Sequence, residues 1–359
     1  MNVLYILNKA VMSGPNIVAL SNAEKLYFSG LKVFIVFLKG GADLSTEFPF
    51  LREIEVIELD SSNSWGKLNY LNKFVRENRM DVIHSHCFYP DLFNVLLKIT
   101  TRLENKKHLS TVHNIPSQDY IIRYGYLKGN ALLAIHKLLL SVLDMCVCIS
   151  KTVQDRLKIK DTTVIYNPVR DVFFNNNKIK PKLLRIVYCG HFSELKNPLN
   201  IITLLSNITT DFKFTGLGDG PILQQCKDKV AGDHRFNFLG RVNNVADYYG
   251  QANCLIHFSQ TEGFCLSVAE ALASSMYVIT NDLPIFYELK DALDADNFFI
   301  LKKLDEDNVY SVLNVISKKL SQHDNDAYEV SERAESLLSS QVTSEKHLCL
   351  YNNLLLKHQ

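Results

Sequence analysis

The sequence lacks an excess of charge of either sign and has no long apolar run. Its 359 residues include 39 Lys and Arg against 38 Asp and Glu. Without a basic field, we expect no nucleic-acid partner. The longest apolar stretch, 131–143, is interrupted by His136 and Lys137 and is too short to cross a bilayer. Residues 1–7 carry no basic leader and have the pattern of a strand, so no secretory signal is expected. These absences favour a cytoplasmic protein.

The eight cysteines lack the spacing of a zinc site. Only Cys146 and Cys148 lie close together, and like Cys189 they occur in apolar runs, where a reduced cysteine packs as a small core residue. We therefore expect a reducing compartment. Hydrophobic residues make up 47% and charged residues 21% of the chain, which suits a folded enzyme. At roughly 150 residues per domain, the length predicts two domains.

Short β-branched or aromatic runs alternate with stretches long enough for helices, in two successive series. This alternation predicts an α/β chain with two doubly wound parallel sheets. A polar segment, 174–182, separates the series, so we expect domains at 1–174 and 183–340. The predicted strands are 3–7, 33–38, 56–59, 81–86, 109–114, 145–150 and 162–167, then 184–190, 212–216, 236–240, 254–259, 277–280 and 297–301.

The segment 261–273 passes from a predicted strand through one glycine into an apolar helix. Backbone N–H groups at a helix start carry partial positive charge, so this turn predicts a diphosphate cradle. Glu262 precedes the cradle, and Glu270 is expected about two turns into the helix. Two carboxylates beside a phosphate cradle suit a nucleotide-sugar, although a loop charge and a solvated helix residue would have the same spacing. The cradle residues are Gly263, Phe264, Cys265 and Leu266.

With these residues the chain resembles the retaining GT-B glycosyltransferases grouped as glycosyltransferase family 4. Glu262 and Glu270 match the E-x7-E signature of that family, whose first glutamate contacts the donor sugar and whose second contacts the ribose. The resemblance implies two Rossmann-like domains that face a central cleft. The N-terminal domain would hold the acceptor, the C-terminal domain the nucleotide-sugar, and residues 341–359 would form a helix that returns to the first domain.

The same resemblance implies further donor-binding residues. Segment 190–198 is similar to the family's loop in which a lysine, here Lys196, pairs with the donor diphosphate; the family usually has arginine where this chain has His191. A surface position is the alternative for both Lys196 and Arg241. The donor-binding set is Gly14, Gly190, His191, Lys196, Gly216, Arg241, Glu262 and Glu270, together with the four cradle residues.

Histidines follow two predicted strands of the first half. The resemblance places a histidine at the position of His113 beside the transferred sugar, and His86 is expected on the acceptor side. His113, Lys196 and Glu262 are thus the predicted catalytic residues. Structural histidines are the alternative, and a metal site at His84 and His86 is a further one, because alternate strand residues share a face.

The predicted function is transfer of a hexose-type sugar, with retention of its anomeric configuration, to a hydroxyl of a glycan or lipid-linked acceptor. The donor is a nucleotide-sugar, and a UDP-sugar is the donor we favour. The family resemblance implies bacterial surface-polysaccharide synthesis. We expect neither a cofactor nor a metal, and we assign the D-x-D at 294–296 to helix capping or solvation. A nucleotide-sugar epimerase and a non-catalytic sugar-nucleotide-binding subunit are the rivals.

The region 120–143 mixes aromatic and aliphatic residues with Arg123, Lys128 and Lys137. With Arg102, Lys106 and Lys107 it would form a basic, aromatic face suited to the anionic inner surface of the cytoplasmic membrane. An ordinary core helix with solvated lysines is the alternative.

Overall fold

The computed structural model describes residues 1–60, 63–101, 106–175, 181–322 and 326–356. The chain forms two compact units: unit 1 contains Met1–Pro168 and Ser340–Gln359, and unit 2 contains Val169–Ser339. Residues 169–174, expected in the first domain, belong to unit 2. The reason is local hydrogen bonding, because the Val169 N–H donates to the Leu338 carbonyl at 2.7 Å and the Ser274 hydroxyl donates to the Phe173 carbonyl at 3.1 Å.

Unit 1 is built on a parallel sheet of seven strands in the order β3-β2-β1-β4-β5-β6-β7. The order reverses between β1 and β4, as in a doubly wound sheet. Val3–Leu7 are all buried, since helices cover both faces of the sheet. The strands are β1 Asn2–Lys9, β2 Lys32–Lys39, β3 Glu55–Glu58, β4 Val82–His86, β5 Lys107–Val112, β6 Met145–Cys148 and β7 Thr162–Val164.

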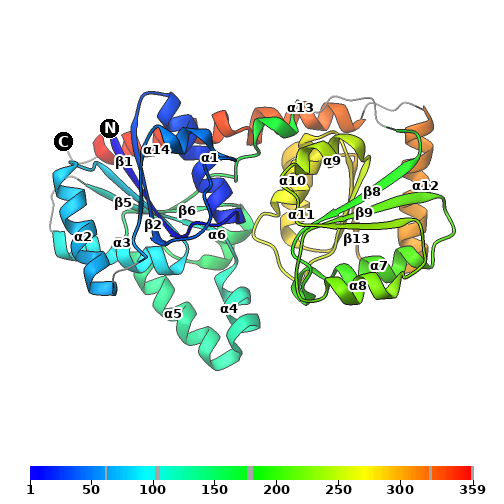
Figure 1. Ribbon diagram of the computed structural model, residues 1–359, viewed down its shortest axis with the longest axis horizontal. Coiled ribbons are helices and arrows are strands. Elements are labelled where there is room, and N and C mark those ends of the chain that lie inside the picture. Colours follow the sequence, from blue (N-terminus) through cyan, green and yellow to red (C-terminus); the bar gives the residue numbers. More distant parts are fainter. Residues whose placement is uncertain (61–62, 102–105, 176–180, 323–325, 357–359) are drawn as a thin grey trace. The chain divides into compact units, whose positions relative to one another are not determined.

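The last helix of the chain, α14, packs in unit 1 beside α1 (Figure 1). The Thr343 hydroxyl donates to Asn22 Oδ1 at 3.0 Å, and Tyr351 is fully buried in the core of this unit. The helices of unit 1 are α1 Gly14–Phe28, α2 Ser64–Glu77, α3 Phe88–Thr101, α4 Pro116–Tyr124, α5 Tyr126–Val142, α6 Lys151–Leu157 and α14 Ser340–Leu356, with a 3-10 turn, η1, at Pro49–Arg52.

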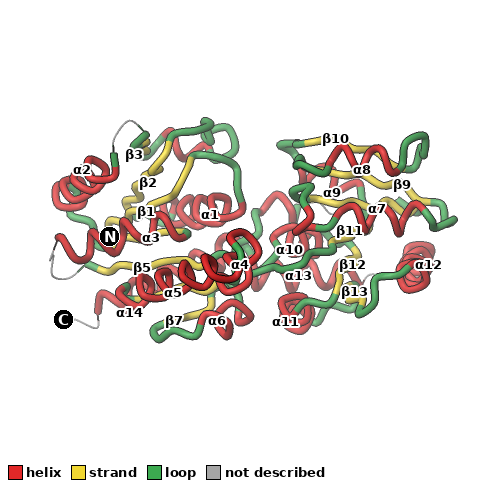
Figure 2. Tube along the Cα trace, turned by 90° about the horizontal axis from the view of Figure 1, so that it is seen from below, coloured by secondary structure: helices red, strands yellow, loops and turns green. Residues whose placement is uncertain are grey.

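Unit 2 is built on a parallel sheet of six strands in the order β10-β9-β8-β11-β12-β13 (Figure 2). Here the order reverses between β8 and β11, and the carboxyl edge at such a reversal is where open α/β sheets bind ligands. The strands are β8 Leu184–Cys189, β9 Phe212–Leu217, β10 Phe236–Gly240, β11 Cys254–His257, β12 Tyr277–Asn281 and β13 Phe298–Leu301.

One face of the unit 2 sheet carries the main hydrophobic core, which includes Ile186, Tyr188, Phe212 and Phe214. The helices are α7 Pro198–Ser206, α8 Leu223–Lys229, α9 Val245–Gln251, α10 Leu266–Ala273, α11 Pro284–Leu293, α12 Glu306–Gln322 and α13 Asp326–Leu338, with 3-10 turns η2 at Asp171–Phe173 and η3 at Glu194–Lys196.

Among the described residues, no helix is both long enough and apolar enough to span a membrane.

Candidate functional site

The loops after β8 and β11 bring two predicted site residues together at the carboxyl edge of the unit 2 sheet. Lys196 Nζ donates to Glu262 Oε1 at 2.5 Å, although the two residues are 66 positions apart in the sequence. The loops are also tied by their backbones, since the Gln260 N–H donates to the Leu195 carbonyl at 2.8 Å. The ammonium group of Lys196 is therefore held in place by the first glutamate of the signature.

Glu262 is buried and accepts a second hydrogen bond on the same oxygen. His257 Nε2, at the end of β11, lies 2.9 Å from Glu262 Oε1. Burial alone would raise the pKa of the Glu262 carboxyl, but attraction to Lys196 and the hydrogen bond from His257 outweigh it and lower that pKa to about 2. Glu262 is thus ionised between two cationic partners.

His257 was absent from the sequence predictions. Burial opposes its charge, but Cys265 and Glu262 together raise the pKa of His257 to about 9, so this imidazole is protonated at neutral pH. The sequence offers little to mark His257 as a site residue, because it is simply the last residue of a buried strand, five positions before Glu262.

Glu270 is the fifth residue of α10 and lies one turn into that helix, nearer its start than the two turns expected. It is 9% exposed, so it is not a solvated helix residue. Burial raises the pKa of Glu270 to about 7, with Arg170 opposing the shift. At neutral pH this carboxyl group changes its protonation readily.

The cradle residues form the turn that starts α10. Cys265 is the N-cap residue and adopts a left-handed backbone conformation with φ of 68°, which a residue with a Cβ adopts at a cost. Its carbonyl accepts the N–H groups of Val268 and Ala269, both at 3.2 Å. The turn therefore fixes the start of α10, with Gly263 and Phe264 buried before it and Leu266 as the first helical residue.

The remaining predicted donor residues of unit 2 lie at the same carboxyl edge. The Gly190 N–H donates to the Leu217 carbonyl at 3.0 Å. Gly216 faces the core, since a Cβ there would lie 2.8 Å from Phe238 Cδ1. His191 and Arg241 are both exposed, after β8 and β10 respectively.

In unit 1 the histidines at the ends of β4 and β5 form a stacked cluster. His86 Nδ1 lies 2.7 Å from His113 Nε2, and the rings of His84 and His86 stack with centroids 4.8 Å apart. His84 is bonded to Tyr351 and to Thr111, at 2.6 and 2.8 Å. Within the described residues, these histidines belong to no group of three potential metal ligands.

All three imidazoles in the cluster are neutral. Burial lowers the pKa of His113 to about 3, and burial with the neighbouring imidazoles lowers the pKa values of His84 and His86 well below the ordinary range. His86 Nε2 is buried and has no hydrogen-bond partner among the described residues. A buried N–H without a partner is rarer than an unused acceptor, so we assign the His86 proton to Nδ1, which donates to His113 Nε2. His113 then carries its own proton on Nδ1.

Gly14, the predicted donor residue of unit 1, is the first residue of α1 and is followed by Pro15. The Asn16 amide shapes the preceding loop by donating to the carbonyls of Lys9 and Val11, both at 2.8 Å. The loop after β1 is therefore fixed by one side chain.

Two family models match this chain: "Glycosyltransferase Family 4" over residues 12–172 and "Glycosyl transferases group 1" over residues 169–328. Together the matches extend from the loop after β1 to the start of α13. The chain is a GT-B glycosyltransferase of family 4.

Relatives of this glycosyltransferase agree with the assignment. The O-antigen biosynthesis glycosyltransferase WclY of Escherichia coli is 24% identical over 370 residues, which cover 99% of this chain and 98% of WclY. A Campylobacter jejuni alpha-1,4-N-acetyl-D-galactosaminyltransferase, whose name specifies a PP-undecaprenol-linked glycan, is 27% identical over 41% of this chain and 45% of its own. The structure of Anabaena Alr3699/HepE in complex with UDP and glucose matches with a TM-score of 0.80, at 15% identity, over 98% of this chain and 99% of HepE.

The glycosyltransferase also has an exposed apolar surface on α4 and α5, which project from the sheet of unit 1 (Figure 1). A buried link holds this pair of helices, since His136 Nε2 lies 2.9 Å from Asp91 Oδ2 on α3 and its Nδ1 lies 2.8 Å from the Tyr120 hydroxyl. We call this the α4–α5 surface; its exposed apolar residues are Ile122, Tyr124, Tyr126, Leu127, Ile135 and Leu138.

Part of the basic face expected near this surface is absent. Lys107 is buried in β5, and Lys106 Nζ donates to the Met80 carbonyl, so neither extends the surface. Arg102 lies outside the described residues. Arg123 and Lys128 are exposed on α4 and α5, but Arg123 Nε donates to Asp119 Oδ1 at 3.0 Å, so this carboxylate offsets the charge of Arg123.

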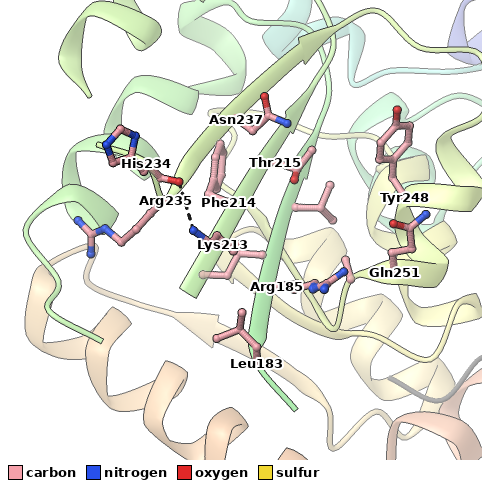
Figure 3. Close-up of a pocket in the computed structure, with 13 residues that line it drawn as sticks. Leu183, Arg185, Lys213, Phe214, Thr215, His234, Arg235, Asn237, Tyr248 and Gln251 are labelled. Carbon is pink, nitrogen blue, oxygen red and sulfur yellow. Dashed lines mark hydrogen bonds between the residues drawn. The ribbon is translucent and has the colours of Figure 1, made fainter. Parts of the chain in front are cut away.

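A separate pocket of about 350 Å³ lies against β8, β9, β10 and α9 (Figure 3). Arg185, Lys213, Tyr248 and Gln251 line it, and Lys213 Nζ donates to the His234 carbonyl at 3.4 Å. None of the predicted donor residues lines this pocket. It opens along the amino-terminal halves of these strands, away from the carboxyl edge.

Proposed function

We propose that this glycosyltransferase moves a hexose-type sugar from a UDP-sugar to a hydroxyl of a glycan or lipid-linked acceptor in bacterial surface-polysaccharide synthesis. The observation that carries the proposal is the Lys196–Glu262 pair beside the start of α10. It places a cation and a hydrogen-bond acceptor next to a helix start at a carboxyl edge. The donor is supported by the complex of HepE with UDP and glucose, and the setting by the role of WclY in O-antigen biosynthesis.

In the proposed mechanism the donor diphosphate binds at the start of α10 and draws Lys196 toward it. Backbone N–H groups and the ammonium group stabilise the negative charge that develops as the sugar leaves. Glu262, released from Lys196 but still bonded to His257, accepts hydrogen bonds from sugar hydroxyls. These cationic groups supply the charge compensation, so we propose transfer without a metal.

We further propose that the anomeric configuration is retained through front-face attack assisted by the leaving phosphate. The E-x7-E resemblance supports retention. Glu270 would accept hydrogen bonds from the ribose hydroxyls, which stabilise its ionised form and supply the partner that a buried carboxylate needs.

His113 is the proposed catalytic histidine of unit 1, and His86 its acceptor-side neighbour. With its proton on Nδ1, His113 offers a fixed donor for a sugar hydroxyl or carbonyl-type oxygen. His86 sets this tautomer through the 2.7 Å hydrogen bond between the two rings.

The α4–α5 surface is the proposed contact with an anionic membrane that carries a lipid-linked acceptor. Its exposed Tyr126 and Leu127 lie next to Lys128, a combination that suits the lipid interface. Vesicle flotation tests this: Leu127→Ser should reduce binding to phosphatidylglycerol vesicles, whereas Phe28→Ser, which removes an exposed aromatic residue on α1, should not.

The function is tested by nucleotide release from UDP-, GDP-, ADP- and dTDP-sugars, with and without a glycolipid acceptor extract and EDTA. We expect acceptor-dependent, EDTA-resistant release of UDP. Conversion of the donor without acceptor would identify an epimerase instead, and donor binding without release from any extract would identify a binding subunit. Anomeric analysis of the product by NMR decides retention.

A further inference from the structure

Three side chains at the signature form a cluster of potential metal ligands, whereas the proposed transfer uses only two of them, Glu262 and its hydrogen-bond partner His257. His257, Glu262 and Cys265 each place one potential metal-ligating atom within 4.8 Å of the other two. In the part of the chain that the structure describes, this is the only such group of three. All three residues are buried, with His257 1%, Glu262 9% and Cys265 6% exposed.

The residues in the cluster are preorganised by the fold. His257 is fixed at the end of β11, while Glu262 and Cys265 belong to the loop that starts α10. Cys265 is held in the left-handed conformation that turns the chain into the helix. The ring of His257 faces both other members of the cluster, since its Nε2 lies 2.9 Å from Glu262 Oε1 and its side chain also hydrogen-bonds to Cys265. The three potential ligand atoms therefore already converge without a metal.

The ligand chemistry selects a thiophilic metal. A thiolate, an imidazole and a carboxylate suit Zn²⁺, whereas Mg²⁺ and Ca²⁺ require sets of oxygen ligands. Three protein ligands leave one tetrahedral position for water. The side chain of Lys196 is 26% exposed and lies against Glu262, so its displacement toward solvent opens the way to this cluster.

We propose that His257, Glu262 and Cys265 bind one Zn²⁺ ion that inhibits the glycosyltransferase. The Cys265 sulfur bonds to the metal and its proton passes to solvent. The protonated His257 ring also releases one proton to solvent, and the nitrogen that is freed donates its lone pair to the metal. Glu262 loses its bond to Lys196 and binds the metal instead. No electron transfer takes place. The inhibitory consequence rests on the proposed function, because bound zinc occupies the glutamate and displaces the lysine that the donor requires. The metal site itself does not depend on it.

Cobalt is the direct probe of the site, because Co²⁺ bound to a thiolate gives a near-ultraviolet charge-transfer band and tetrahedral Co²⁺ gives intense visible bands. The intact protein, stripped with EDTA and carrying Cys349→Ser to remove the exposed thiol, is titrated with Co²⁺. We expect both bands at one equivalent and their loss on adding Zn²⁺. Their absence in this protein would overturn the proposal.

Two ligand variants and a matched control complete the test. Cys265→Ser should lose the charge-transfer band, and His257→Gln should weaken Co²⁺ binding by about tenfold or more. Cys189→Ser, which alters another cysteine at the carboxyl edge, should keep both bands. Circular dichroism confirms folding of each variant. A charge-transfer band that persists in folded Cys265→Ser, or one that vanishes in Cys189→Ser alone, would assign the metal to other residues and overturn the proposal.

Activity measurements separate this proposal from the proposed function. Zn²⁺ should inhibit UDP release and EDTA should restore it, and Cys265→Ser should need about tenfold more Zn²⁺ for the same fractional inhibition. If the protein shows the cobalt bands but has no transferase activity, the metal site stands and the function fails. If the metal-free enzyme transfers sugar and Zn²⁺ neither binds nor inhibits, the function stands and the zinc site fails.

Discussion

Glu262 and Glu270 belong to one signature and are equally buried, yet the structure gives them opposite pKa shifts. Lys196 and His257 surround Glu262 and lower its carboxyl pKa to about 2. Around Glu270 burial dominates, with Arg170 as the opposing charge, and its pKa rises to about 7. Equal burial therefore says little about charge, because the partners of a carboxylate decide its protonation.

The difference suits two roles. In the proposed mechanism the ionised Glu262 holds Lys196 before the donor arrives and would then accept hydrogen bonds from sugar hydroxyls. Glu270 would become fully charged when ribose hydroxyls reach it, so the proposal couples donor binding to its ionisation. The predictions below test this contrast, from the largest expected effect to the smallest.

The largest effect is expected from removing the cation beside Glu262. Lys196→Ala should lower kcat/KM by roughly 10²- to 10³-fold, the usual cost of losing one group that stabilises the developing charge. Lys196→Arg should recover part of this loss. Lys213→Ala, in the pocket on the sheet face, is the control and should leave kcat/KM within about twofold. Full turnover by Lys196→Ala would remove Lys196 from the mechanism.

The stabilities of two amide variants should respond to pH in opposite ways. The folded-state pKa of Glu262 is depressed, so its contribution is present above about 4.5 and is lost as pH falls toward 2. Glu262→Gln should therefore cost about 3 kcal/mol of unfolding free energy at pH 7, and less as the pH falls below 4.5. Urea unfolding at several pH values measures this. A cost that is the same at pH 3 and pH 7 would contradict the ionised assignment.

Glu270→Gln should show the reverse. The folded-state pKa of Glu270 is raised, so the wild type loses stability as pH rises from about 4.5 to 7. The amide variant escapes this loss and should exceed the wild type by about 3 kcal/mol at pH 8, with no difference below pH 4.5. If both amide variants had parallel pH profiles, the comparison between the two glutamates would fail.

Donor affinity should follow the ionisation of Glu270. Ribose hydroxyls stabilise the carboxylate, so KM for the donor should fall about tenfold as pH rises through about 7, and Glu270→Gln should remove this dependence. Initial rates at saturating acceptor measure the effect. Glu288→Gln, on α11, is a matched control and should retain the wild-type profile.

The smallest effect is expected in the neutral histidine cluster, which contrasts with the protonated His257. His86→Phe removes the partner that fixes the His113 tautomer, and kcat should fall by about three- to tenfold. The NMR shifts of the His113 ring nitrogens should change from one tautomer toward a mixture. Wild-type shifts showing the proton on Nε2 would reverse the tautomer assignment.

Much of the fold follows from local patterns. Each of the thirteen predicted strands overlaps an observed one. The signal is clearest for buried strands such as β1 and β2, because buried parallel strands are continuous apolar runs. The expected strand 162–167 is shortened to Thr162–Val164 at the sheet edge. The end of the first domain was harder to predict from the sequence. Residues 169–174 belong to unit 2 because of hydrogen bonds to Leu338 and Ser274, which lie more than 100 positions away in the sequence.

The sequence by itself determined the order of strands and helices, the position of the glutamate signature and the choice of Lys196 as a cation. Only the tertiary structure decided that Lys196 meets Glu262 and that His257 is a second partner of this carboxylate. It also decided that Glu270 is buried, with only Arg170 opposing the rise of its pKa. Strand and helix patterns depend on neighbours in the sequence, whereas pKa values depend on burial and on charges brought from distant positions. That is why the chemistry of the two glutamates required the folded chain.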